Sequence, residues 1–445
     1  MNARAQQRSF TDAESALIEA FDQADRRLVG ASELRAAAMA RFAASGLPNR
    51  RVEAWHYTDL RALLREIAPV REPNATSLDY ARECLEDAAA QTHAARLIVF
   101  NGAYRPELSD LDRLPSGVAV TSLSEELAAG AADVLSAISG EGQGADDAVV
   151  ALNAALMQDG VVVRVAPGAQ VERPLAIVNL MSGGSAHSSF VRSLVLVGDG
   201  ASISVTETTA ACDPAATQTN EALVLKIGRN CKVEYVSRVT LQGDGAIALN
   251  SVLATLDEGS ELNGFAFAPQ PAIARRQYFV RLNGRHARST IGGLSLLRAK
   301  QHADTTLVID HAVPDCVSRE FFRHILDDES TGVYQGKVVV RQHAQKTDGA
   351  MKSQAIMLGD DATMNNKPEL EIFADDVVCG HGATVGQLDD DQIFYLQARG
   401  LARAEAESLL LEAFANEALD MVADEKVRER FVAQTAEWLS HRGGK

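Results

Sequence analysis

One short segment brings together two side chains that bind transition metals. In VCGHGATVG, residues 378–386, Cys379 and His381 stand two positions apart. In an extended strand such side chains lie on one face, and Gly380 between them leaves room for a close approach. One thiol and one imidazole suit iron or zinc, but two ligands do not hold either ion in a stable site. A metal site here needs ligands from a neighbouring strand or a second chain, and the alternative of a structural histidine beside a small thiol stays open.

Other segments with residue types found in catalytic or binding motifs lack the spacing that those motifs require. GVYQGKV, residues 332–338, is one residue too short between its glycines for a nucleotide-binding loop, and Val338 stands where a hydroxyl should bind magnesium. The sequence has no GxSxG, HExxH or CxxC motif. A further group of potential ligands is spaced too irregularly for a known metal motif, and we interpret it as structural: His302, His311, Cys316 and His324.

Composition narrows the classes of partner. The 445 residues include 43 Lys and Arg against 60 Asp and Glu, a net charge of −17 without a dense basic block, so we expect no nucleic-acid partner. The N-terminus lacks the apolar stretch of a signal peptide, and no apolar run approaches the roughly 18 residues of a membrane span. We therefore expect no membrane association and a cytoplasmic location. Five scattered cysteines, an odd number, argue against a disulfide framework.

Two regions precede the core in the expected organisation. Residues 1–95 predict an N-terminal helical region, in which Thr11 and Glu14 have the spacing of a capping box. Residues 96–150 predict a connecting segment of mixed type. It begins with a strand over Leu97–Phe100 and contains a Gly-rich loop over residues 139–147.

Residues 151–386 consist of short runs rich in Val, Ile, Leu and Thr. Turns around Gly168, Gly200, Asn230 and Gly259 follow one another at steps of 32, 30 and 29 residues. Such a period, without intervening helices, predicts a β-solenoid whose coils stack on one another. A β-sandwich with long hairpins is the alternative.

Residues 387–445 predict a C-terminal helical region. It either covers the open end of the solenoid or offers a face to another protein. The apolar residues in question are Phe394, Tyr395, Leu409, Leu410 and Phe414.

Four stretches carry a resemblance to a known family. They are GLPNRRVEAWHYTDL (46–60), ALNAALMQDGVVVRV (151–165), GVYQGKVVVRQHAQKTDG (332–349) and the run from NNKPELEIF to LQARG (365–400). Together they resemble the SufB/SufD family, the scaffold subunits of Suf iron–sulfur cluster assembly. SufB proteins carry a cysteine in a P-x-I-E-C pattern, and PELEI places Ile372 there. This departure favours the SufD branch.

The resemblance implies a right-handed parallel β-helix between helical ends. It also implies a non-catalytic subunit that pairs with SufB, docks the SufC ATPase through the C-terminal apolar residues named above, and forms a homodimer when isolated. By this resemblance, His381 matches a histidine at the SufB interface that helps to hold a transient iron or iron–sulfur cluster with a SufB thiolate, and Cys379 matches the cysteine beside it in the family. No cofactor is expected to bind the isolated chain tightly, and flavin binding is left open.

Two other functions stay in view. A β-solenoid enzyme acting on carbohydrates would need paired carboxylates and stacking aromatic residues, and this chain has only two tryptophans, Trp55 and Trp438. The second alternative is a purely structural homodimer that has no role in metal binding.

Overall fold

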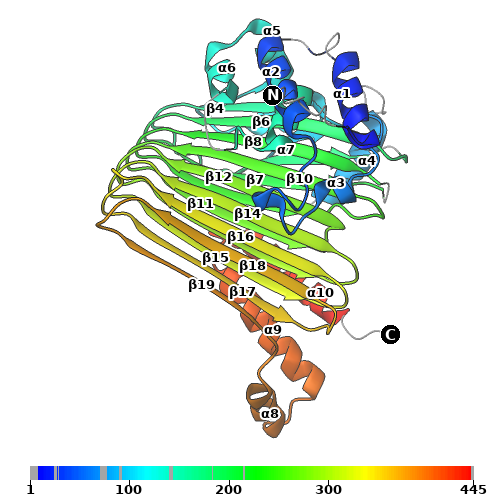
Figure 1. The fold of residues 1–445 in the computed structure, drawn as a ribbon, viewed down its shortest axis with the longest axis vertical. Coiled ribbons are helices and arrows are strands. Elements are labelled where there is room, and N and C mark those ends of the chain that lie inside the picture. The colour runs from blue at the N-terminus through cyan, green and yellow to red at the C-terminus, as the bar shows by residue number, and fades with distance from the viewer. Residues whose placement is uncertain are drawn as a thin grey trace, which may run out of the picture.

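Two parallel sheets face each other along most of the molecule. The computed structural model describes residues 9–24, 28, 30–70, 78–89, 93–139, 144–182, 184–213 and 216–441. Strands alternate between the sheets, so that each pair of consecutive strands forms one coil of a β-solenoid of about eight turns (Figure 1). The solenoid prediction is confirmed, and the alternative of a sandwich is wrong.

The sheet order follows from this alternation. One sheet has ten strands in the order β19-β17-β15-β13-β11-β9-β7-β5-β1-β2, and the other has nine in the order β18-β16-β14-β12-β10-β8-β6-β4-β3. The strands are β1 (Ala95–Phe100), β2 (Ala103–Tyr104), β3 (Val118–Ser122), β4 (Val161–Val165), β5 (Leu175–Met181), β6 (Ser188–Val197), β7 (Ser202–Ala211), β8 (Gln218–Ile227), β9 (Lys232–Val239), β10 (Ile247–Leu256), β11 (Glu261–Pro269), β12 (Ile273–Leu282), β13 (Arg288–Leu297), β14 (His302–His311), β15 (Val317–Leu326), β16 (Thr331–Val340), β17 (Asp348–Met357), β18 (Thr363–Ile372) and β19 (Val378–Gly386).

Helices lie at both ends of the sequence. The N-terminal helices are α1 (Asp12–Ala24), α2 (Ser32–Ser45), η1 (Glu53–Trp55), α3 (Leu60–Leu63) and α4 (Leu78–Ala89), followed by η2 (Pro106–Leu108), η3 (Leu111–Arg113), α5 (Leu123–Ala129), α6 (Ala132–Ser139) and α7 (Ala148–Leu156). The C-terminal helices are α8 (Asp390–Ala398), α9 (Arg403–Leu419) and α10 (Glu425–Ser440). The predicted capping box is present, since Thr11 N–H donates to Glu14 at 2.9 Å and Glu14 N–H donates to Thr11 at 3.2 Å.

The turns repeat as the sequence period predicts. Gly168, Gly200, Asn230 and Gly259 all have positive φ, between 55° and 73°. Left-handed backbone is the conformation that favours glycine and asparagine, which explains why these residues mark the period. The predicted strand over Leu97–Phe100 is also present, but β1 pairs with β5 and so belongs to the ten-stranded sheet. Of the predicted Gly-rich loop, residues 140–143 lie outside the described part of the chain.

The solenoid interior is largely apolar and contains a buried polar network. The Tyr235 hydroxyl donates to Glu207 at 2.5 Å and accepts from Arg276 at 2.9 Å. Glu221 accepts from Thr209 at 2.6 Å. Burial, with the charge of Glu207 acting in the same direction, raises the pKa of Glu221 to about 8. These side chains hold neighbouring coils together through hydrogen bonds as well as apolar contact.

The segment that contains Trp55 lies across the outer face of the nine-stranded sheet. Beneath it, Arg275 of β12 forms a buried ion pair with Asp304 of β14, and the guanidinium lies 3.7 Å from the centre of the Trp55 ring. The Ala54 carbonyl accepts from Arg275 and from Gln335 of β16, at 2.6 and 3.0 Å. One short segment therefore connects three neighbouring strands, which gives the sequence around Trp55 a structural role.

Two of the cysteines form a disulfide that the sequence did not predict. Cys84 of α4 and Cys212, directly after β7, form a disulfide with a Cα–Cα separation of 5.5 Å. The two residues are 128 positions apart and meet in a small apolar cluster beside β1 and β5. A single bridge is not a disulfide framework, and sequence spacing carries no signal for a contact over that distance.

Candidate functional site at the open end of the solenoid

The last coil leaves both sheets with an open edge. β19 pairs with β17 on one side and β18 pairs with β16, and among the described residues no strand covers their other sides. His381 lies on β19 with its side chain exposed, and Cys379 is half-buried. An edge strand offers unpaired N–H and C=O groups to another chain. The sequence segment with the metal-binding residue types is therefore also the free edge of the molecule.

The register shows which way these side chains face. Cys379 lies beside Gly349 of β17, and His381 lies beside Met351. Met351 belongs to the interior cluster, against which Cys379 also packs. Cys379 and His381 thus lie on one face, as strand alternation predicts, and that face is the inner one. His381 is exposed because, within the described ranges, no further coil covers the solenoid beyond it.

The surroundings of Cys379 favour the protonated thiol. Burial raises the pKa of Cys379, and the nearby charges of Asp348 and Glu320 act in the same direction. The backbone N–H of Gly349 opposes them by favouring the thiolate. A metal ion that bound this sulfur would have to displace its proton, which makes affinity depend on pH.

The site does not provide a complete ligand set. Within the described ranges, no group of three or more His, Cys, Asp or Glu side chains is arranged to hold a metal ion. Met351 places a thioether beside His381, but this side chain is packed into the interior. Any metal bound by Cys379 and His381 takes further ligands from outside this part of the chain, as their spacing implies.

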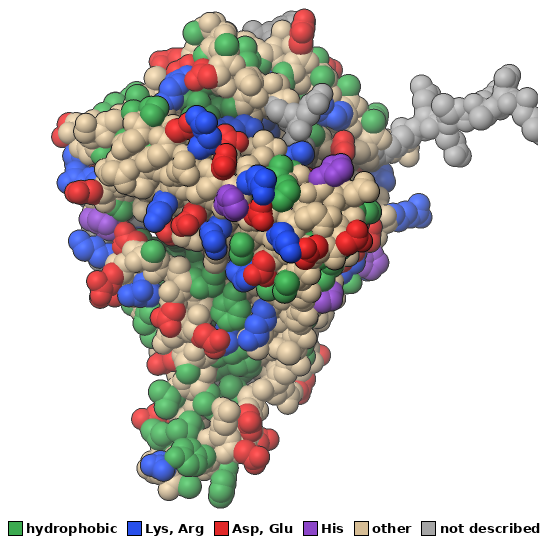
Figure 2. Space-filling view, turned by 90° about the vertical axis from the view of Figure 1, so that its left-hand side faces the viewer, with side chains coloured by type: hydrophobic (Ala, Val, Ile, Leu, Met, Phe, Trp, Pro, Cys, Tyr) green, Lys and Arg blue, Asp and Glu red, His purple; other side chains and the backbone are tan. Residues whose placement is uncertain are grey.

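The predicted partner-binding residues divide into two groups. Phe394 and Tyr395 on α8 are 72% and 57% exposed, and Leu409 on α9 is 47% exposed. Figure 2 shows hydrophobic side chains gathered on the projecting tip of the molecule where α8 lies. Leu410 is partly buried and lines a cavity of about 330 Å³ between α8 and α9. Phe414 is also partly buried, because it packs against the helix cluster on the ten-stranded sheet with Arg323 over its ring.

The other candidate ligands lie inside the fold. His311 and His324 are buried in the solenoid, where burial lowers the pKa of each to about 4. Burial raises the pKa of Cys316 to about 11. His302 shares a hydrogen bond with Thr58 beneath the Trp55 segment. Their structural interpretation fits these positions, and GVYQGKV forms part of β16 rather than a nucleotide-binding loop.

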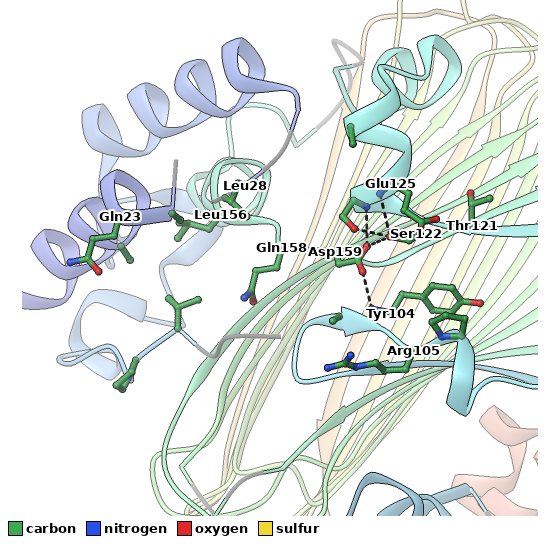
Figure 3. Close-up of a pocket in the computed structure, with 18 of the residues that line it drawn as sticks. Gln23, Leu28, Tyr104, Arg105, Thr121, Ser122, Glu125, Leu156, Gln158 and Asp159 are labelled. Carbon is green, nitrogen blue, oxygen red and sulfur yellow. Dashed lines mark hydrogen bonds between the residues drawn. The ribbon is translucent and has the colours of Figure 1, made fainter. Parts of the chain in front are cut away.

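A cavity of about 1290 Å³ lies at the other end of the molecule, between α1 and the β2–α5 region (Figure 3). Its buried carboxylate, Asp159, accepts hydrogen bonds from Tyr104 N–H, the Ser122 hydroxyl and Ser124 N–H at 2.9–3.0 Å. These bonds join β2, the β3–α5 junction and the start of β4. The carboxylate therefore serves the fold, and we assign no ligand to this cavity.

Comparison with known proteins decides the family. Residues 179–414 match the model described as "SUF system FeS cluster assembly, SufBD core domain", and residues 12–177 match "SufBD protein N-terminal region". The chain belongs to the SufBD family. These features, namely the open edge, the exposed His381 and the projecting helices, therefore belong to a SufBD protein of Suf-system iron–sulfur cluster assembly.

Similar curated proteins extend over nearly the whole chain. The iron–sulfur cluster assembly protein SufD of Escherichia coli is 29% identical over 89% of this chain and 90% of its own length. An iron–sulfur cluster assembly SufBD family protein of Synechocystis is 28% identical over 84% of both chains. Protein ABCI7, chloroplastic, of Arabidopsis thaliana is 25% identical over 86% of this chain and 81% of its own. The resemblance to the SufD branch is thus confirmed.

Among the described residues, no helix is long and apolar enough to cross a bilayer.

Proposed function

We propose that this SufBD family protein is a non-catalytic scaffold subunit that pairs with a SufB subunit through its open coil and docks the SufC ATPase through its C-terminal helices. The observation that carries the proposal is the exposed His381 on an edge strand that, in the described part of the chain, has no neighbouring strand on its outer side. A side chain with metal-binding chemistry at an unpaired edge becomes useful when a second chain completes both the sheet and the ligand set.

The exposed apolar side chains at the open coil support an interface there. Val378 and Val385 on β19, Ile372 at the end of β18 and Phe373 directly after it are all exposed. Main-chain hydrogen bonds from a partner strand would continue the sheet while these side chains become buried. In the absence of the partner, the same edge pairs with a second copy of this chain and forms a homodimer.

The chemistry at the interface is transient metal binding. In this proposal His381 supplies an imidazole, Cys379 supplies a second ligand once its thiol is deprotonated, and a SufB thiolate completes the set. Iron–sulfur centres accept histidine in place of cysteine. Iron and sulfide are the cargo of such a site, so the isolated chain holds no tightly bound cofactor.

The C-terminal helices supply the second interface. Phe394, Tyr395 and Leu409 form an apolar surface on the part of the chain that projects beyond the solenoid, and we assign it to SufC (Figure 1). Leu410 supports this surface from beneath. Phe414 holds α9 against the ten-stranded sheet, since its carbonyl accepts from Arg323 at 2.8 Å.

Sugar cleavage gains no support from the interior carboxylates. Glu207 and Glu221 are 4% and 1% exposed, and their oxygens bind Tyr235, Thr209 and Asn250 inside the solenoid. Neither carboxylate faces a groove that a polysaccharide can enter.

Iron and sulfide analysis of the assembled complex tests the proposal. The chain is co-expressed with SufB and SufC subunits and purified anaerobically, with His381→Ala and, as a control, His343→Ala at another exposed histidine. We expect all three forms to fold and to co-purify with their partners, and His381→Ala alone to lose most of the bound iron and sulfide. An unchanged iron content in the His381→Ala complex removes His381 from the mechanism, and failure of the wild-type chain to co-purify with SufB removes the interface.

A further inference from the structure

Three of the five positions on the outer face of β19 are glycines. Because Cys379 and His381 face inward, the alternate positions 380, 382 and 386 face outward, and all three are glycines. Around the place where each of these glycines would carry a Cβ, no heavy atom of the described residues lies within 4 Å. The free edge of the molecule is therefore bare on its outer side around His381.

The other glycines in the described strands are covered. Phe322 of β15 lies beside Gly293 of β13 in the sheet register, with ring carbons 2.7 and 2.8 Å from the Cβ position. Gly332 of β16 is covered in the same way by the Met364 sulfur of β18, at 2.8 Å. The remaining four have side-chain atoms at 3.6 Å or closer: Gly264 beside Ile291, Gly292 beside Met421, Gly336 beside Tyr334 and Met351, and Gly349 beside Ser318, Val338 and Cys379.

Backbone conformation does not explain the three bare glycines. None of them has a positive φ, so other residues fit the same backbone. Glycine in a strand is less favourable than alanine because it loses more conformational entropy on folding. Glycines inside strands commonly mark a place where another chain approaches closely. Elsewhere in this solenoid, the covering side chain comes from a neighbouring strand, from the same strand, from the facing sheet or from an element packed on the sheet.

We propose that the partner subunit adds a strand to the free edge of β19 and that its side chains opposite Gly380 and Gly382 are large and apolar, as Phe322 is opposite Gly293. An aromatic ring leaning over a cross-strand glycine recovers the contact area that the glycine lacks. Val378, 72% exposed on the same outer face, extends an apolar surface for such a strand. This inference rests on the proposed scaffold function and adds what the partner presents to the outer face of β19.

Filling the bare face tests the inference. Gly380→Val and Gly382→Val, singly and together, place β-branched side chains where the surrounding space is open, so each variant should fold with an unchanged or slightly raised melting temperature. Crowding a packed contact disturbs the side chains around it. We therefore expect the double variant to bind the SufB subunit about tenfold more weakly or worse in a titration monitored by biolayer interferometry.

Matched variants make the outcome decisive. Thr384→Val lies on the same face of the same strand and replaces one β-branched residue by another, so its affinity for SufB should stay within twofold of wild type. Gly382→Ala adds a single methyl group and should weaken binding about threefold, which provides a test if a valine variant folds poorly. Equal affinity of the glycine variants and wild type overturns this inference while the proposed function stands. Absence of binding by the wild-type chain overturns the proposed function as well.

Discussion

The two ends of the solenoid are finished in opposite ways. At the N-terminal end, the edge strands β2 and β3 are two and five residues long and run antiparallel to β1 and β4, and α1, α2 and α7 share an apolar cluster with outward-facing residues of β6 and β10. At the C-terminal end, the edge strands β18 and β19 are ten and nine residues long and parallel to their neighbours, and α9 and α10 lie on the outer face of the ten-stranded sheet. A stacked-coil protein needs covered ends to avoid association. The exposed end is therefore the one adapted to join another chain, and substitutions should affect stability in the covered regions and association at the open one.

The largest effect is expected beneath the Trp55 segment. Arg275→Ala leaves the Asp304 carboxylate buried without its ion-pair partner and removes the cation that stacks on Trp55. Breaking such a buried pair typically costs about 3–5 kcal/mol. Equilibrium urea unfolding should show this loss, whereas Arg229→Ala, which breaks an exposed pair with Asp199, should cost about 1 kcal/mol or less. Equal losses in the two variants would contradict the structural role of the Trp55 segment.

A slightly smaller change in folding stability should accompany a rise in pH, because a carboxyl group is buried in the solenoid interior. Burial raises the pKa of Glu320 from 4.5 to about 8. As pH rises from 5.5 to 9, the unfolded chain is already ionised while the folded carboxyl keeps its proton until about pH 8. The folded state therefore loses roughly 3 kcal/mol of stability over that range.

Glu320→Gln tests this interior effect. It should remove that part of the pH dependence in urea unfolding at pH 5.5 and pH 9. Glu329→Gln, at an exposed turn position, should leave the pH dependence unchanged. If both variants behave like wild type, Glu320 is not protonated inside the solenoid.

A substitution at the open end should change the self-association of the chain rather than its folding stability. Val378→Lys places a charge on the free edge strand, the device by which natural edge strands avoid pairing. Self-association of the isolated chain, followed by sedimentation velocity, should weaken about tenfold, while unfolding changes by less than about 0.5 kcal/mol. Leu111→Lys, an equally drastic change near the covered end, should leave association as in wild type. A stronger effect of Leu111→Lys would reverse the assignment of the two ends.

The smallest effect concerns α8, beyond the open end. Asp389 caps this helix by accepting from Asp391 N–H at 2.9 Å. Asp389→Ala should destabilise α8 by about 1 kcal/mol and leave the solenoid unchanged. Amide exchange within residues 390–398 should then accelerate about fivefold, with no change in β11–β17. An unchanged exchange rate in α8 would show that the helix is held by contacts other than its cap.

Local sequence patterns predicted much of this fold. The turn residues revealed the solenoid because left-handed backbone favours glycine and asparagine, and Thr11 with Glu14 marked the first helix. Alternation also placed Cys379 and His381 on one face. The buried carboxyl groups of the interior were not predicted. A polar residue in a strand, such as Glu207, normally faces solvent, and its sequence position alone does not show that it faces inward.

Other features depend on contacts between distant segments. The disulfide joins residues 128 positions apart, and no local pattern reports such a contact. The bare outer face of β19 depends on what surrounds three glycines, although their alternate spacing in VCGHGATVG was a visible signal. The exposure of His381 follows from the end of the sheet, which the sequence indicated only through family resemblance.

Hydrogen–deuterium exchange in the chain alone and in complex with the SufB subunit tests the central claim most directly. The measurement compares backbone amides of β18 and β19 with those of β2 and β3, at concentrations where the isolated chain is monomeric. The account predicts that amides of β19 become protected in the complex while those of β2 and β3 keep their rates. Protection confined to the N-terminal end, or none at β19, would contradict it.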